Sequence, residues 1–204
     1  MALSPGITST MARLRAPQRR EQLIEVATRV FARCGYDAAT TAAIAQGAGV
    51  TEPILYRHFA GKRELFLTIV RAASQRIVER LRQTADRARR PSRKIGAIGR
   101  EFPQHVSELQ DAYEVIHSAL AAGRDKKILW AVKEHYCEIE RFFRNIIADG
   151  QKSGEFRRNL DPQTPTWQLI NASMGYAISA LELQQAEQFS IRAAVGFILD
   201  GLKA

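Results

Sequence analysis

The spacing of hydrophobic residues predicts helices along almost the whole chain. Apolar residues recur at intervals of three and four, and no window of four to eight residues alternates between apolar and polar as a half-buried strand would. The first helix is expected over residues 17–33, with an apolar face formed by Leu23, Val26, Ala27, Val30 and Phe31. The pattern therefore predicts an all-α fold.

Glycine, threonine and proline positions divide this pattern into nine expected helices. Thr51 is expected to cap the third helix, and Pro103 is expected to break or kink the chain between the fifth and the sixth. The expected helices cover residues 17–33, 40–47, 51–58, 63–89, 92–102, 103–122, 125–149, 166–184 and 190–203.

The second and third helices meet the steric demands of a helix-turn-helix motif. Two short helices are joined by a turn in which Gly49 can adopt a positive φ, and Ala45 is small where the helices must cross. The residues expected to pack inward are Ile44, Ala48, Val50 and Leu55. Because other short amphipathic helices can satisfy part of this list, the motif alone is only moderately specific.

The location of the positive charge supports a nucleic-acid partner. Residues 1–100 hold 19 Lys and Arg against 7 Asp and Glu, whereas residues 101–204 hold 11 against 14. This asymmetry is typical of a nucleic-acid-binding module joined to a neutral or acidic one, although a solvated charged surface is the alternative.

The segment TTAAIAQGAGVTEPILYRHFAGKRELF resembles the amino-terminal domain of TetR-type transcriptional regulators. The matching residues are Ile44, Ala45, Ala48, Gly49, Val50, Thr51, Leu55, Tyr56, Phe59 and Lys62. The resemblance implies a DNA-binding head, a long linking helix, and a carboxyl-terminal domain that dimerises and holds a small-molecule effector. On this basis we expect a flexible basic arm at residues 1–16, the head at 17–62, the linking helix at 63–90 and the effector-binding and dimerisation domain at 91–204.

The candidate DNA contacts lie around the third helix. Thr41, Tyr56, Arg57, His58 and Lys62 are expected to contact phosphates, and Thr51, Glu52, Pro53 and Ile54 are expected to face the bases. The alternatives are a packed aromatic for Tyr56, a solvated charge for Arg57 and, for Glu52, an acid that only stabilises the helix dipole.

Two other basic segments have simpler explanations. Arg13, Arg15, Arg19 and Arg20 could reach phosphates or a minor groove, but a disordered arm explains them equally well. The run RQTADRARRPSRK ends the linking helix, away from the expected DNA side, and is interpreted as solvated surface.

Aromatic and polar residues in the second half could line an apolar effector pocket, although each of them could also be ordinary core. The candidates are Phe102, His105, Tyr113, His117, Trp130, Tyr136, Trp167, Asn171 and Met174. They predict a hydrophobic or aromatic effector.

The last two expected helices carry apolar faces and small residues suited to pairing about a twofold axis. The candidates for this dimer interface are Ile170, Met174, Ile178, Leu181, Ile191, Val195, Ile198 and Leu202, with intramolecular packing as the alternative. A homodimer would bind a near-palindromic operator whose half-sites lie about one helical turn apart.

Rival classes of protein are less well supported. The four histidines are scattered, and no nucleophile motif, phosphate loop or metal-ligand spacing is present, so we expect neither an enzyme nor a cofactor or metal. An architectural DNA-binding protein without an effector is the main alternative.

Cys34 and Cys137 are expected to fill core positions. The absence of a long apolar run or an apolar leader predicts a cytoplasmic protein that starts at Met1 or Met11.

Overall fold

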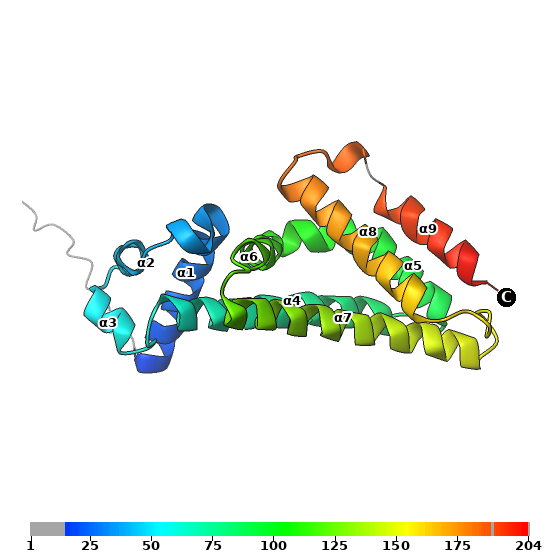
Figure 1. The fold of residues 1–204 in the computed structure, drawn as a ribbon, viewed down its shortest axis with the longest axis horizontal. Coiled ribbons are helices and arrows are strands. Elements are labelled where there is room, and N and C mark those ends of the chain that lie inside the picture. Colours follow the sequence, from blue (N-terminus) through cyan, green and yellow to red (C-terminus); the bar gives the residue numbers. More distant parts are fainter. Residues whose placement is uncertain (1–14, 189, 204) are drawn as a thin grey trace, which may run out of the picture.

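A computed structural model describes residues 15–188 and 190–203, which form nine α-helices and one short 3-10 helix (Figure 1). The helices are α1 (Ala16–Ala38), α2 (Thr41–Gly47), α3 (Glu52–Tyr56), α4 (Lys62–Asp86), α5 (Pro91–Glu108), α6 (Gln110–Ala121), α7 (Lys126–Lys152), α8 (Gln163–Leu181), η1 (Ala186–Gln188) and α9 (Ile191–Leu202). The predicted all-α class and the order of nine helices are confirmed over this part of the chain.

Helices α1, α2 and α3 form a small head around a continuous core. Leu23, Ala27 and Phe31 of α1 are fully buried, as the three-and-four spacing predicts. Helical conformation is interrupted at Gly35, where φ is +74°. Only glycine adopts this left-handed conformation without strain, and the chain can therefore turn here towards α2.

Helix α4 leaves the head and runs along α7 beneath the other helices of the body, while α8 and α9 lie beside α5 on the opposite side (Figure 1). Leu65, Ile69, Val70 and Ile77 bury the apolar face of α4. Helix α6 packs against both α1 and α4, so the head and the body share an interface.

Of the two outcomes predicted for Pro103, a break or a kink, the break is wrong. Helix α5 continues through Pro103 to Glu108, and the chain leaves helical geometry at Leu109, where φ is −116° and ψ is 28°. A proline removes one hydrogen bond from a helix, but Ile98, Phe102 and Val106 are buried on both sides of this position and hold the turn in place.

The predicted burial of the cysteines is also wrong. Cys34 on α1 and Cys137 on α7 are both exposed, on the solvent side of helices whose opposite faces supply the core. No helix among residues 15–188 and 190–203 has the length and apolar content required to cross a bilayer.

Candidate DNA-binding surface and effector cavity

The α2–turn–α3 unit is held by a small apolar core and a tight turn. Ile44 and Ala45 of α2 are buried against Leu55 of α3 and the rest of the head. Gly49 has a φ of +65°, and the Val50 N–H donates to the Ala45 carbonyl at 2.9 Å. The short helix α3 is therefore anchored on one side and presents its other side to solvent.

Solvent reaches the beginning of α3, where base contacts are predicted. Thr51 and Pro53 are exposed, and Glu52 and Ile54 are partly exposed. The expected cap is absent: Thr51 occupies the N-cap position, but its hydroxyl makes no hydrogen bond to the helix. Because this hydroxyl has no role within the helix, it is available to a ligand.

Two of the predicted phosphate contacts come together on the exposed side of the head. The Thr41 hydroxyl lies 3.2 Å from the Tyr56 hydroxyl, at hydrogen-bond distance, and the Tyr56 side chain is 51% exposed. Arg57 is exposed and His58 is partly exposed one and two residues further on. A packed aromatic, the alternative for Tyr56, is not what the structure shows.

Lys62 has different partners from those expected of a phosphate ligand. Its Nζ donates to the carbonyls of Tyr36, Asp37 and Ala39 at 2.9, 3.2 and 3.0 Å. It also lies 4.6 Å from the centre of the Tyr36 ring, within the range of a cation–π interaction.

The amino-terminal arginines and the basic run at the end of α4 have different contacts. Arg13 lies outside the described residues, whereas the Arg20 guanidinium stacks 4.9 Å from the centre of the Phe59 ring. In the run that ends α4, the arginines form ion pairs within the body, at Arg82–Glu138, Arg87–Glu101 and Arg90–Glu155. This run lies at the end of α4 remote from α3 (Figure 1), in agreement with its interpretation as surface.

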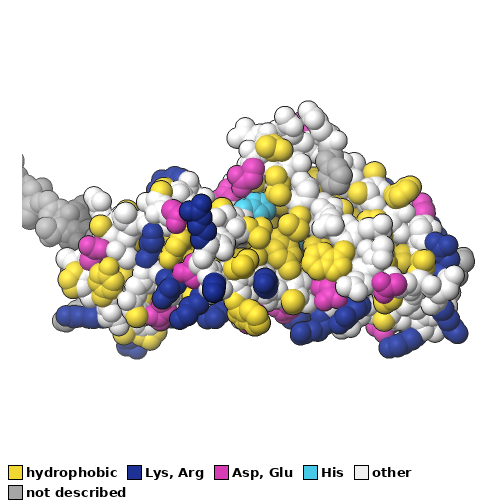
Figure 2. Space-filling view, in the orientation of Figure 1, with side chains coloured by type: hydrophobic (Ala, Val, Ile, Leu, Met, Phe, Trp, Pro, Cys, Tyr) yellow, Lys and Arg dark blue, Asp and Glu magenta, His cyan; other side chains and the backbone are white. Residues whose placement is uncertain are grey.

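A cavity of about 40 Å³ lies between α4, α5, α6, α7 and α8. Space-filling Figure 2 shows hydrophobic side chains gathered over the region bounded by α6, α7 and α8, with a histidine at the upper edge. The cavity is lined by Ile77, Leu81, Phe102, Tyr113, Ile116, His117, His135, Tyr136, Ile139, Phe143, Ile170, Ser173, Met174 and Ala177.

None of the described residues that line this cavity is Lys, Arg, Asp or Glu, and burial keeps Tyr113, His135 and Tyr136 neutral at pH 7. Burial lowers the pKa of His135 to about 4 and raises the pKa of Tyr136 to about 12. Burial also raises the pKa of Tyr113. His135 Nδ1 lies 2.9 Å from the Ser74 hydroxyl, which fixes the ring. The lining is therefore mainly apolar, with a few hydrogen-bonding groups, of which His117 Nδ1 lies 3.2 Å from Glu182 Oε1.

Five of the predicted pocket residues line the cavity: Phe102, Tyr113, His117, Tyr136 and Met174. Trp130, Trp167 and Asn171 do not, because they lie on the exposed sides of α7 and α8. His135 was not among the predicted pocket residues, although it lies three residues after Val132 and four before Ile139, and this spacing places it on the buried face of α7.

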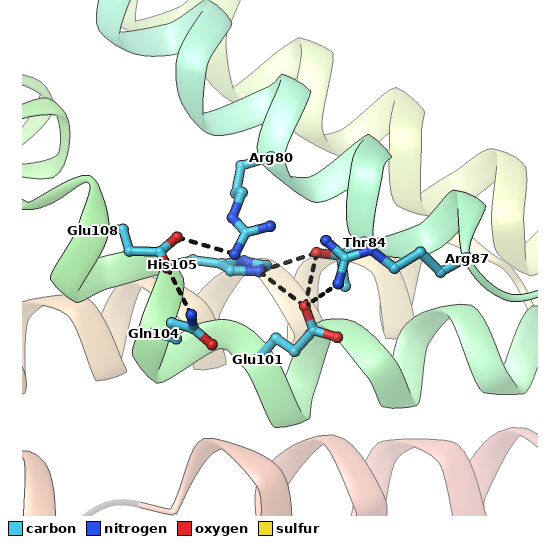
Figure 3. Close-up of polar contacts among 7 residues, drawn as sticks. All are labelled: Arg80, Thr84, Arg87, Glu101, Gln104, His105 and Glu108. Carbon is cyan, nitrogen blue, oxygen red and sulfur yellow. Dashed lines mark hydrogen bonds and ion pairs between the residues drawn. The ribbon is translucent and has the colours of Figure 1, made fainter.

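His105, also predicted for the pocket, lies instead in a polar cluster between α4 and α5 (Figure 3). Its Nε2 is 3.0 Å from the Thr84 hydroxyl, and Arg87 Nη1 pairs at 3.0 Å with Glu101, which also accepts from Thr84. Burial, followed by the positive charge of Arg80, lowers the pKa of His105 to about 4.

The predicted dimer residues divide between the interior and the surface. Ile170, Ile191, Val195 and Leu202 are buried within the protomer, and Met174 lines the cavity. Ile178 is 38% exposed, whereas Leu181 and Ile198 are partly buried. Most of the chosen residues thus belong to the faces of α8 and α9 that pack on α5 and α7.

A different apolar face of α8 and α9 is open to solvent. Trp167 and Ile178 are exposed on α8, and Phe197 on α9 is 82% exposed. Beside them, Gly175 and Gly196 have no atoms within contact distance of the place a Cβ would occupy.

Comparison with known proteins agrees with this architecture. Residues 23–69 match the family model described as bacterial regulatory proteins of the tetR family. The chain is 37% identical over 100 residues to the transcriptional activator FasR of Mycolicibacterium smegmatis, a match that covers 47% of this chain and 45% of FasR. It is 28% identical over 151 residues to the repressor KstR2 of Mycobacterium tuberculosis, covering 70% and 72% of the two chains.

A solved structure of a TetR transcriptional regulator from Chloroflexus aurantiacus superimposes with a TM-score of 0.79 at 20% identity, covering 90% of this chain and 93% of that one. At this identity the likeness concerns the fold. The helix-turn-helix head on a helical body, together with these relatives, defines a DNA-binding transcriptional regulator and not an enzyme. Within that class, residues 23–69 match the tetR family model, and the rest of the chain is similar in fold to a TetR transcriptional regulator.

Proposed function

We propose that the protein is a homodimeric repressor that binds a near-palindromic operator and is released by a small, uncharged, apolar effector. The observation that carries this proposal is the course of α4. This helix follows α3 in the chain after residues 57–61, and further along it supplies Ile77 and Leu81 to the cavity. One helix therefore connects the DNA-binding head, where it packs on α1, to the effector cavity.

The exposed start of α3 supplies sequence readout in this proposal. Thr51 and Ile54 can contact a thymine methyl group, and Glu52 can accept a hydrogen bond from cytosine N4. Such a contact is worth about 1–3 kcal/mol of discrimination. Glu52 also lies in the first turn, where an acid stabilises the helix dipole by about 0.3–1 kcal/mol, so the two roles are compatible.

Phosphate contacts are assigned to residues that flank this readout surface. Thr41 and Tyr56 present adjacent hydroxyl groups, and Arg57 adds an exposed positive charge. His58, which is partly exposed, lies at the edge of the same surface. These contacts set the position of the head on DNA and do not depend on base sequence.

The open face of α8 and α9 is proposed as the dimer interface. An aromatic ring as exposed as Phe197 is costly in water, and the neighbouring glycines leave room for a partner helix to approach closely. Pairing through Trp167, Ile178 and Phe197 would make a four-helix bundle with the twofold-related helices.

The chemistry of the cavity limits the effector. A volume of about 40 Å³ holds roughly three water molecules, so the helices around the cavity must move apart to admit an organic ligand. The wall offers phenol and imidazole groups, and the carboxylate of Glu182, 3.2 Å from His117 Nδ1, is already paired with that ring. An apolar ligand with one or two uncharged oxygens therefore fits better than a ligand whose charge would be buried.

Movement of the helices around the cavity can transmit effector binding to the DNA-binding head. Helix α6 carries Tyr113, Ile116 and His117 to the cavity and packs on its other side against α1. Since packed helices shift as rigid bodies, expansion of the cavity would displace α6 and α4 together and change the orientation of the head.

Selection of bound duplexes from a random DNA pool tests the DNA-binding part. We expect a near-palindromic sequence with half-sites 34–36 Å apart or slightly more. Titration with N-phenyl-1-naphthylamine, an uncharged fluorescent probe, tests the cavity: binding should raise the melting temperature, and Ile139→Trp, which fills the cavity, should abolish the rise.

Two results would contradict the proposal in different ways. If no preferred sequence is selected, the proposed binding to a specific operator is wrong, and the alternative of an architectural DNA-binding protein is favoured. A probe that binds Ile139→Trp as well as the wild type would place the ligand outside the cavity.

A further inference from the structure

We infer that Lys62 is a positioning residue that closes the helix-turn-helix segment on itself, and that it does not bind a DNA phosphate. The inference rests on the proposed DNA binding and assigns Lys62 a role different from that of Tyr56 or Arg57. It follows from which atoms the Lys62 ammonium group contacts and where those atoms lie along the chain.

The ammonium group of Lys62 has three N–H donors, and all three have partners. The acceptors are the carbonyl oxygens of Tyr36, Asp37 and Ala39, at distances of 2.9 to 3.2 Å. The Tyr36 ring lies 4.6 Å from Nζ on a further side. To reach a phosphate, the side chain would exchange three charge-assisted hydrogen bonds for one new contact.

The carbonyl acceptors need this cation. Helical geometry is interrupted at Gly35, so the carbonyls of Tyr36, Asp37 and Ala39 lie beyond the regular part of α1, in the segment that leads to α2. An ammonium group has three N–H donors and can satisfy several such carbonyls at once through charge-assisted hydrogen bonds. Lys62 supplies it from a position 23 to 26 residues away in the sequence.

The segment enclosed by these bonds is the complete helix-turn-helix unit. Ala39 directly precedes Thr40, whose side chain caps α2, and Lys62 is the first residue of α4. Residues 40–61, including α2, the turn and α3, therefore lie between two points that Lys62 ties together. The bonds fix the exit of α3 relative to the entry of α2, and so the orientation of Tyr56 and Thr51 towards DNA.

Arg63, the residue after Lys62, attaches the beginning of α4 to the body. Arg63 Nη1 lies 3.3 Å from Asp125 Oδ2, and the Asp125 side chain also caps the start of α7. Lys62 thus faces the head while Arg63 faces the body, and the beginning of α4 is fixed on both sides.

The dependence of DNA binding on salt distinguishes a lysine that contacts a phosphate from a lysine that only positions the DNA-binding helices. Each phosphate contact contributes about −0.9 to the slope of log K against log salt concentration. The experiment compares the wild type with Lys62→Met by fluorescence anisotropy, on a duplex selected by the wild type, over a series of NaCl concentrations and well below the melting temperature of both proteins. Lys62→Met is expected to lower affinity roughly 10- to 100-fold with the slope unchanged.

Matched variants show whether the loss of affinity comes from the lost charge or from the lost hydrogen bonds of Lys62. Arg29→Met also removes a positive charge from the head, on a side that faces α5 and α6, and should change neither affinity nor slope. Lys62→Gln is uncharged but keeps two N–H donors, and should recover part of the affinity that Lys62→Met loses. If Lys62→Met destabilises the head too far for binding, the Lys62→Gln slope provides the same comparison.

A slope reduced by about 0.9 for each lost contact would overturn the inference, and so would unchanged affinity in Lys62→Met. If the wild type selects no DNA sequence, the proposed function has failed, and hydrogen exchange decides the role of Lys62 separately. Lys62→Met should then accelerate exchange at the Ile44 and Ala48 amides, which bond within this segment, and unchanged exchange there would refute the positioning role.

Discussion

At the scale of single residues, the surroundings of each polar group decide what it can do. Tyr56 and Lys62 are six positions apart, and both match the family pattern, yet Tyr56 is half exposed and Lys62 is fully occupied by carbonyls. His105 and His135 are both buried and neutral, but only His135 lines the cavity.

The Tyr56 hydroxyl is expected to bind phosphate and not bases. Tyr56→Phe keeps the ring and should weaken DNA binding by about 0.5–1.5 kcal/mol, the value of one hydrogen bond. Anisotropy titrations with a selected duplex and with a scrambled duplex should show equal losses. Because Thr41 is hydrogen-bonded to Tyr56, Thr41→Val combined with Tyr56→Phe should cost less than the sum of the single losses. A loss confined to the selected duplex would instead assign base readout to Tyr56.

The two buried histidines should make stability depend on pH between about 6.5 and 4. Their pKa values in the folded protein are about 4, whereas an unfolded histidine titrates near 6.5. Between these values the unfolded chain binds more protons than the native protein, so the free energy of unfolding falls as pH falls. The loss is about 3 kcal/mol for each histidine at pH 4.

Urea unfolding at a series of pH values measures this dependence. His105→Gln should reduce the slope of stability against pH in this window by about half, because His135 still titrates. An unchanged slope would show that His105 is not held neutral in the native protein.

At the scale of the helices, contacts between neighbours override local preferences. Pro103 lies within α5 because packing holds the turn, whereas Leu109 ends the helix with no proline. Helices α5 and α9 also approach closely at Gly99, where a Cβ atom would lie 2.9 Å from Val195 side-chain carbons.

Two glycines on α5 give a matched test of this close approach. Gly99→Ala should destabilise the protein by about 1–3 kcal/mol, because the added methyl group overpacks the contact with Val195. Gly96→Ala, one turn earlier, has 3.4 Å of space and should be neutral or stabilising by up to about 1 kcal/mol. Thermal unfolding of both variants measures the difference. Equal effects would mean that helix propensity, and not packing, controls these positions.

At the scale of the whole molecule, the open face of α8 and α9 is expected to decide the assembly state. Phe197→Asp places a charge where an apolar contact is proposed, and it should convert a dimer to a monomer in sedimentation velocity measurements. Trp130→Ser is the control, since Trp130 is 62% exposed but lies on α7, away from this face. Its dimer should be unaffected, and a Phe197→Asp protein that remains dimeric would exclude the proposed interface.

The sequence alone determined the order of the helices and the helix-turn-helix unit. Periodic apolar residues and the turn at Gly49 depend on local geometry, and local geometry is determined by residues that are close in the sequence. It also indicated apolar faces on α8 and α9, but it could not say whether these faces pack within one protomer or between two. Apolar spacing is identical for a face buried inside a chain and a face buried between chains.

Only the tertiary structure decided the long-range contacts. The bonds between Lys62 and the end of α1 span more than 20 residues. The placement of His135 in the cavity, and of His105 in the cluster with Thr84 and Glu101, likewise depends on where α4, α5 and α7 meet. Such contacts follow from the packing of whole helices, because a local apolar pattern can show that a position such as His135 is buried but not which residues it will meet.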